Sequence, residues 1–148
     1  VYEALQRIYD KEDFVGAPGE DTAEASHIIV TIDDWSCEDD CLTGEPFNGT
    51  TTVRYKGVIC WRMIYWGKVL PNAISRSEQI YALLLDAFRK APKNAPYRGP
   101  SFATDGEMVY ANIWHGDIAK FHGQEKIMSS EEEWLFECDY RGGLVNVF

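Results

Sequence analysis

The sequence predicts an α+β fold in which two helix-plus-three-strand repeats form one twisted antiparallel sheet with both helices on one face. Three observations predict it. A helical apolar period precedes each of two strand-rich blocks, apolar and polar residues alternate along the strands, and the second block repeats motifs of the first. We therefore expect the 148 residues to form one domain with an internal duplication, residues 1–70 and 75–148 being its repeats.

The duplication rests on matching motifs. Phe47-Asn48-Gly49 returns as Phe121-His122-Gly123 after 74 residues, and residues 61–67 return as 136–142 after 75 residues. The slip of one residue falls in a hairpin loop, where insertions are tolerated. Upstream of these motifs, HIIVTIDDW in the first half is expected to correspond to MVYANIWHGD in the second.

Each repeat is expected to begin with a helix. The first, over residues 2–11, is short, and the second has an apolar face with spacings of three and four residues. Ser75 and Glu78 predict a capping box at the start of the second helix, and Pro92 predicts its end. The residues of that apolar face are Ile80, Leu83, Leu84, Ala87 and Phe88.

The strands are read from a period of two. Trp61, Met63 and Tyr65 share one face of residues 58–66, and Phe136 and Tyr140 share one face of residues 134–140. Turn signals at 56–57, 129–130 and 142–143 separate the strands. Consecutive strands with such short links pair antiparallel, which completes the predicted sheet.

Composition excludes several classes of protein. The net charge of −10 argues against a direct nucleic-acid or membrane-surface binder, which needs basic residues to meet phosphates. No apolar run approaches the roughly 18 residues of a membrane helix, and no leader peptide is visible, so we expect a cytoplasmic protein. The four cysteines lack the spacing of a disulfide framework, and neither a metal nor a cofactor is expected.

Charge is segregated along the chain. Residues 12–53 contain eleven acidic residues and no Lys or Arg, whereas residues 54–100 carry nine basic residues. The basic middle either packs between the acidic ends and pairs with them, or the segment DDWSCEDD forms an acidic loop that is a negative patch for a basic partner. The candidate partner-binding residues of that patch are Asp33, Asp34, Glu38, Asp39 and Asp40.

An ordered set of motifs carries a family resemblance. CWRMIYWGKVL, SEQIYALLLDAFRKAP, Tyr97-Arg98-Gly99-Pro100, DGEMVYANIWHGD, FHGQEKI and residues 140–143 (YRGG) follow one another along the chain. Over roughly residues 45–146 the sequence resembles a bacterial domain of unknown function, family 5680. Some members carry an N-terminal helix-turn-helix, which implies regulatory or antitoxin-like roles. The resemblance implies no activity and no cofactor.

The chain departs from the resembled pattern at polar positions. It has Thr51 where the family tends to have Glu, Ile64 where it tends to have Asn, and Arg141 where it tends to have His. If these positions form a site in the family, this chain has altered part of it.

Two carboxylates are the candidate catalytic groups. Glu125 follows a Phe-x-Gly turn and Asp139 lies near the end of the last strand. Two such groups serve as acid and base when their surroundings separate their pKa values. The simpler interpretation is that both are exposed strand residues that balance Lys126 and Arg141.

Aromatic residues are the candidate ligand-binding groups, because Tyr and Trp combine a large apolar body with a polar atom. Core filling is their ordinary role. Tyr65 and Tyr140 occupy equivalent repeat positions, so a cleft between the repeats would bring them together, with positive charge from two arginines. The candidate ligand-binding residues are Trp61, Arg62, Tyr65, Tyr97, Arg98, Trp114 and Tyr140.

These observations favour a non-enzymatic protein-binding or regulatory module, and an antitoxin-like or immunity role with a basic partner is one concrete version. The alternative is a small-molecule-binding protein or hydrolase with Glu125, Asp139, Tyr65 and Tyr140 between the repeats. The third alternative is a homodimer that pairs through an open sheet edge. The two carboxylates discriminate the first two, because an acid–base pair must lie on one face of the sheet.

Overall fold

The computed structural model describes residues 1–10 and 25–146. Two α-helices, one 3-10 helix and eight strands make up this part of the chain. In chain order they are α1 (Tyr2–Tyr9), β1 (Ala25–Ile32), β2 (Trp35–Leu42), β3 (Phe47–Tyr55), β4 (Val58–Val69), η2 (Pro71–Arg76), α2 (Ser77–Arg89), β5 (Phe102–Thr104), β6 (Met108–Asp117), β7 (Lys120–Ser129) and β8 (Trp134–Leu144).

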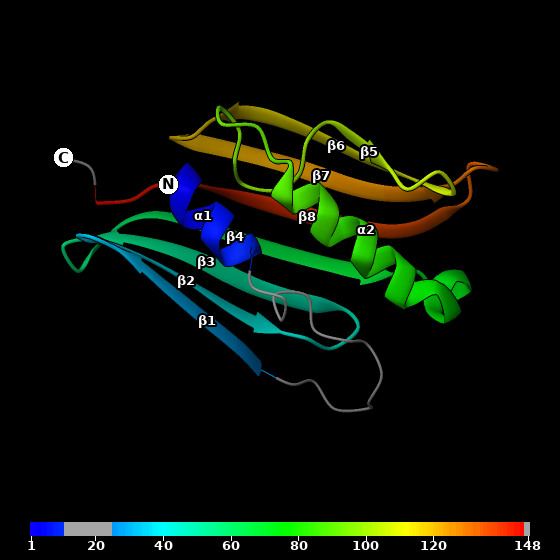
Figure 1. Cartoon of the computed structure of the whole chain (residues 1–148), viewed down its shortest axis with the longest axis horizontal. Coiled ribbons are helices and arrows are strands. Elements are labelled where there is room, and N and C mark those ends of the chain that lie inside the picture. The colour runs from blue at the N-terminus through cyan, green and yellow to red at the C-terminus, as the bar shows by residue number, and fades with distance from the viewer. Residues whose placement is uncertain (11–24, 147–148) are drawn as a thin grey trace.

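All eight strands form one antiparallel sheet in the order β1-β2-β3-β4-β8-β7-β6-β5 (Figure 1). The predicted pair of helix-plus-three-strand repeats is wrong, because each helix is followed by four strands. β4 and β8 pair at the centre, with Tyr65 opposite Tyr140. From either edge of the sheet toward this pair the strands follow in chain order, β1 to β4 on one side and β5 to β8 on the other. A duplication would produce this arrangement. The division into repeats at 1–70 and 75–148 stays a prediction.

The strands that the prediction lacked are β2 and β5. β2 is the acidic segment that the sequence analysis took for a loop, and β5 has only three residues. β2 pairs with β3, and β6 pairs with β7. Residues 108–117 are therefore the counterpart of β2, and not of the HIIVTIDDW segment that forms β1.

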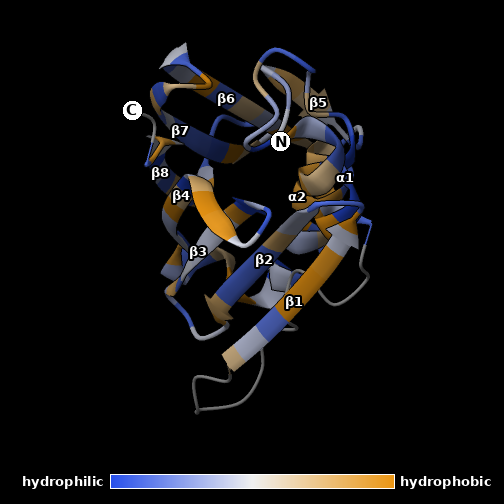
Figure 2. Cartoon of the chain, turned by 90° about the vertical axis from the view of Figure 1, so that its left-hand side faces the viewer, coloured by the Kyte–Doolittle hydropathy of each residue, from blue (hydrophilic) through white to orange (hydrophobic). Residues whose placement is uncertain are grey.

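The sheet is strongly curved, and Figure 2 shows it bending around α1 and α2, which lie on its concave side. α1 contacts β1, β2 and α2, whereas α2 contacts β5 and β6. The core lies between sheet and helices, and it holds Trp61, Met63 and Tyr65 of β4, which were predicted to share one face.

The helices follow their predicted apolar faces, but their ends differ. All five residues of the α2 face are buried, as predicted. The Ser75–Glu78 capping box is wrong: residues 71–76 form a 3-10 helix, α2 begins at Ser77, and the hydroxyl of Ser77 donates to the Ile74 carbonyl at 2.6 Å. Among the described residues, no helix is long and apolar enough to cross a membrane.

Candidate functional site

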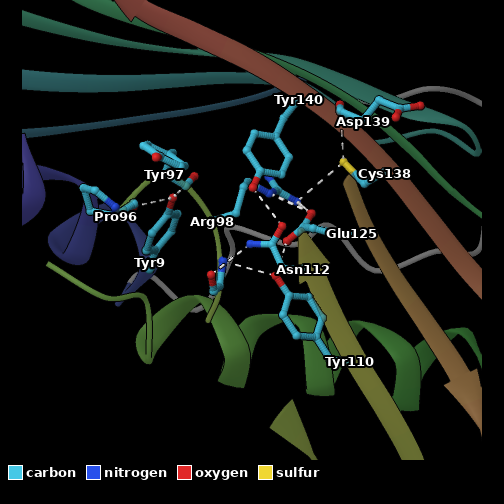
Figure 3. A network of polar contacts seen from close by, with 11 residues as sticks. Tyr9, Pro96, Tyr97, Arg98, Tyr110, Asn112, Glu125, Cys138, Asp139 and Tyr140 are labelled. Carbon is cyan, nitrogen blue, oxygen red and sulfur yellow. Dashed lines mark hydrogen bonds and ion pairs between the residues drawn. The ribbon is translucent and has the colours of Figure 1, made fainter. Parts of the chain in front are cut away.

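A fully enclosed ion pair lies on the concave side of the sheet. Arg98, in the segment between α2 and β5, is 1% exposed, and Glu125 of β7 is fully buried. The Nε and Nη2 atoms of Arg98 each lie 2.8 Å from one carboxylate oxygen of Glu125 (Figure 3). The guanidinium also lies 4.2 Å from the ring centre of Phe88 and 5.0 Å from that of Tyr65. Both members of this ion pair are therefore fully enclosed.

Hydrogen bonds extend this pair into a network across β6, β7 and β8 (Figure 3). The hydroxyl of Tyr110 donates to the second oxygen of Glu125 at 2.6 Å and accepts from the Gly99 amide at 3.1 Å. Asn112 donates to the Gly99 carbonyl at 2.9 Å and accepts from the Tyr140 hydroxyl at 2.8 Å. The segment that carries Arg98 is thus fastened to the sheet at its backbone as well as at its side chain.

The first half of the chain contains a smaller version of this network. Thr51 of β3 and Tyr65 of β4 donate to the two carboxylate oxygens of Asp39 on β2, at 2.6 and 2.8 Å. Asp39 is opposite Thr51, just as Asn112 is opposite Glu125 in the second half. Burial raises the pKa of Asp39, and the two hydrogen bonds oppose that rise.

Two glycines make room for the central tyrosines. A Cβ at Gly49 would overlap the Tyr65 hydroxyl, and a Cβ at Gly123 would overlap the Tyr140 hydroxyl. The Phe-x-Gly motifs that indicated the repeat are therefore positions of close approach in both halves.

The chemistry of this cluster is that of a closed scaffold. Its carboxylates accept hydrogen bonds from neighbours that are at most 5% exposed and so offer almost no surface to a substrate. Burial also raises the pKa of Tyr65, Tyr110 and Tyr140, so their hydroxyls stay protonated as donors. The network stabilises the centre of the sheet, where uncompensated polar groups would be costly.

Glu125 and Asp139 lie on opposite faces of the sheet. Glu125 is opposite Cys138 and points to the core, whereas Asp139 is exposed, opposite Gln124, whose side-chain amide donates to it at 3.2 Å. The two carboxylates therefore cannot act on one substrate as acid and base.

The aromatic candidates are largely core residues. Trp61 is fully buried and donates from Nε1 to the Ile118 carbonyl at 3.0 Å. Tyr97 stacks on Phe121 with ring centres 3.8 Å apart. Among the other candidates, Arg62 is exposed and Trp114 is half-buried. The structure thus brings Tyr65, Tyr97, Arg98 and Tyr140 together inside the core, where Tyr97 stacks on Phe121 and the other three belong to the buried polar networks.

The acidic patch is mostly paired within the protein. On the outer face of β2, Glu38 accepts from Arg54 of β3 at 2.8 Å, and Asp40 bonds to His27 of β1. The hydrogen bond to Asp40 raises the pKa of His27. At the β1–β2 turn, which also holds Asp33, the side chain of Asp34 lies 3.6 Å from that of Lys56. Asp39, the fifth acid, points into the core.

A groove of about 490 Å³ lies on the outer face of the sheet, the face away from the helices, over β4, β8 and β7. Residues directly opposite each other in antiparallel strands share a face, and here Ile64 is opposite Arg141, which is opposite His122. Beside this row, Trp66 is opposite Asp139. Ile64 is 50% exposed and Trp66 is 41% exposed. The groove therefore combines accessible apolar side chains with accessible charges.

None of the residues that face this groove from outside was among the predicted ligand-binding residues. Ile64 and Trp66 alternate along β4 with Tyr65, which was a predicted ligand-binding residue but points into the core. One signal was available: Ile64 and Arg141 are two of the departures from the resembled family pattern, and they are cross-strand neighbours in the groove. The third departure, Thr51, lies in the buried network.

The fold and the site define an antiparallel sheet protein with a closed polar core and an open outer groove. Residues 39–145 match the family described as a domain of unknown function (DUF5680). The chain belongs to this family, which confirms the resemblance drawn from the ordered motifs. Searches of curated proteins and of solved structures each found no match.

Proposed function

We propose that this chain is a non-enzymatic binding module that recognises a partner protein through the outer face of its sheet. One observation carries the proposal: the groove on that face presents an exposed Ile64 and Trp66 beside Arg141 and Asp139. Trp and Arg dominate the energetic centres of protein interfaces, and apolar anchors with flanking charges are their usual setting.

The position of the groove supports the proposal. Both helices lie on the concave side of the sheet, so that within residues 1–10 and 25–146 no helix covers β4, β8 and β7 from outside (Figure 2). Large apolar side chains that remain exposed beside one another are typical of interaction surfaces. The partner that fits presents an apolar anchor to Ile64 and Trp66 and a carboxylate to Arg141.

The acidic patch of Asp33, Asp34, Glu38, Asp39 and Asp40 supports a basic partner less well. Four of its five acids already have a partner within the chain: Arg54 for Glu38, His27 for Asp40, Lys56 for Asp34, and hydroxyl donors for Asp39. A basic partner would have to compete with these contacts for little net gain in free energy. We therefore place recognition on the outer groove, and an antitoxin-like or immunity role would use this face.

Site-specific cross-linking tests the proposal. A photoreactive amino acid at position 66 should give a discrete adduct in the native host. The matched control is the same amino acid at Phe102, which is 60% exposed on the edge strand β5. Arg141→Glu should abolish the adduct at 66 while leaving the unfolding midpoint unchanged. Identical adducts at both positions, or none at 66, would contradict the proposal.

A further inference from the structure

The two edges of the sheet differ in length and in protection. At one edge β5 has three residues, whereas at the other β1 has eight, and in the described part of the chain β1 pairs only with β2. A long edge strand offers a row of backbone donors and acceptors to any further strand. Proteins protect such edges with Lys, Pro or a β-bulge. β1 contains no Lys and no Pro, and its pairing with β2 is continuous over all eight positions, without a bulge.

β1 is also neutral and rich in β-branched residues. Residues 25–32 (ASHIIVTI) contain no Asp, Glu, Lys or Arg, although 26% of the chain is charged. Ile29 is 54% exposed on the outer face, opposite Glu38 of β2. A strand of this composition has high β propensity, and it has no Asp, Glu, Lys or Arg that would repel a copy of itself. Its one titratable side chain, His27, is already bonded to Asp40 of β2.

We propose that β1 pairs antiparallel with β1 of a second copy of this chain, so that the two sheets become one. The dimer has a two-fold axis perpendicular to the sheet, which keeps the outer faces of both copies on the same side. A register centred on Ile29 places Ile29 opposite Ile29, Ile28 opposite Val30, and His27 opposite Thr31. Every cross-strand pair is then free of like charges.

The acidic β2 strands of the two copies repel each other, and the distance between them determines how strongly this repulsion opposes the pairing. Adjacent strands are about 4.8 Å apart, so the two β2 strands of the dimer lie roughly 14 Å from each other. The Debye length is about 8 Å at physiological ionic strength and about 30 Å at 0.01 M. Added salt therefore screens the repulsion between the two copies, and dimerisation should strengthen with salt.

The other occupant of this edge would be an extended basic segment of a different protein. Its Lys and Arg side chains would be attracted by the acids of β2, so its binding would weaken with salt. The sign of the salt dependence separates the two occupants. We argue for the second copy because β1 is self-complementary and because the acids of β2 are already paired.

The test is sedimentation of the full chain over a range of protein concentrations at low and at physiological salt. We expect a monomer–dimer equilibrium whose dissociation constant falls as salt rises. Ile29→Lys should raise that constant about tenfold or more, because it brings a charge to the new strand pair in both copies. The matched control is Ile113→Lys on β6, which is 67% exposed and far from β1, and it should dimerise like the wild type.

Amide hydrogen exchange supplies a second measurement, because pairing protects backbone amides. Residues 25–32 should exchange more slowly as the protein concentration rises, and β5 should not. A monomer at every concentration in physiological salt would overturn the proposal, as would equal effects of the two lysine variants. A monomer that binds a basic peptide at β1, with affinity lost in salt, would also overturn it in favour of the other occupant. None of these outcomes depends on the outer groove.

Discussion

Replacing Glu125 by Gln tests the central ion pair. The substitution keeps the size of the side chain and removes its charge. In the folded protein Glu125 accepts two hydrogen bonds, one at 2.8 Å from Arg98 Nε and one at 2.6 Å from the Tyr110 hydroxyl, and Arg98 Nη2 lies 2.8 Å from the same carboxylate. Both charged groups are at most 1% exposed. In the variant the guanidinium of Arg98 therefore stays buried without a counter-charge.

The expected loss is large relative to the stability of a domain. Removing one partner of a buried ion pair costs about 3–5 kcal/mol, whereas a whole domain is stable by about 5–15 kcal/mol. A loss of 1 kcal/mol lowers the melting temperature by roughly 2–4 °C at about this chain length. We therefore expect Glu125→Gln to melt roughly 6–20 °C below the wild type.

Urea unfolding followed by tryptophan fluorescence measures the free energy of unfolding directly. Glu137→Gln is the matched control, because Glu137 is a β8 residue that pairs with Lys68 at 3.5 Å in a partly exposed setting. We expect the control to lose less than about 1 kcal/mol. The double variant Arg98→Met/Glu125→Leu should lose less than Glu125→Gln, because no charge remains buried. Equal losses for Glu125→Gln and Glu137→Gln would refute the reasoning.

Three further predictions follow from the buried groups. Burial raises the pKa of Asp39 above its ordinary value of 3.8, so the folded state binds this proton more tightly and loses stability as pH rises through the raised pKa. In unfolding experiments at pH 3.5 to 7, the free energy of unfolding of Asp39→Asn should therefore rise relative to that of the wild type as pH increases. A difference that stays constant with pH would contradict this. Gly123→Ala places a methyl group against Tyr140 and should cost about 1–3 kcal/mol in thermal unfolding, so an unchanged midpoint would show that the strands can shift. The hydroxyl of Tyr97 is buried without a hydrogen-bond partner among the described residues, so Tyr97→Phe should leave the unfolding free energy unchanged or raise it by up to about 1 kcal/mol; a loss beyond that range would reveal a partner.

Local periodicity carried most of the correct predictions. The alternation in residues 58–66 placed Trp61, Met63 and Tyr65 on one face of the strand, and all three are buried. The spacing of three and four residues identified the apolar face of α2. Such patterns depend on the repeat of the backbone itself, which is the same in every protein.

Residues 33–40 were expected to form an acidic loop, whereas residues 35–42 form the strand β2. Its acids are accommodated only by residues distant in sequence: Glu38 by Arg54, and Asp39 by Thr51 and Tyr65. A period of two runs through the segment, since Cys37, Asp39 and Cys41 are all buried, although acidic residues are disfavoured in strands.

The candidate site was only partly predictable for a similar reason. Arg98 and Glu125 were both singled out, yet their pairing depends on how the segment before β5 crosses β7. The opposite orientation of Glu125 and Asp139 follows from the register of β7 on β8, in which Glu125 is opposite Cys138. A shift of one residue in that register would reverse both side chains.

By itself, the sequence determined the family, the antiparallel sheet and the inward faces of its helices and central strands, because these depend on motifs and on short-range periodicity. Only the tertiary structure decided the number of strands, the curvature of the sheet, the closure of the polar network and the position of the outer groove. These features depend on contacts between residues far apart along the chain, such as Arg98 with Glu125 and Ile64 with Arg141. Short-range patterns carry no record of which distant residues meet, so the surface available for binding becomes visible only when the strands are paired.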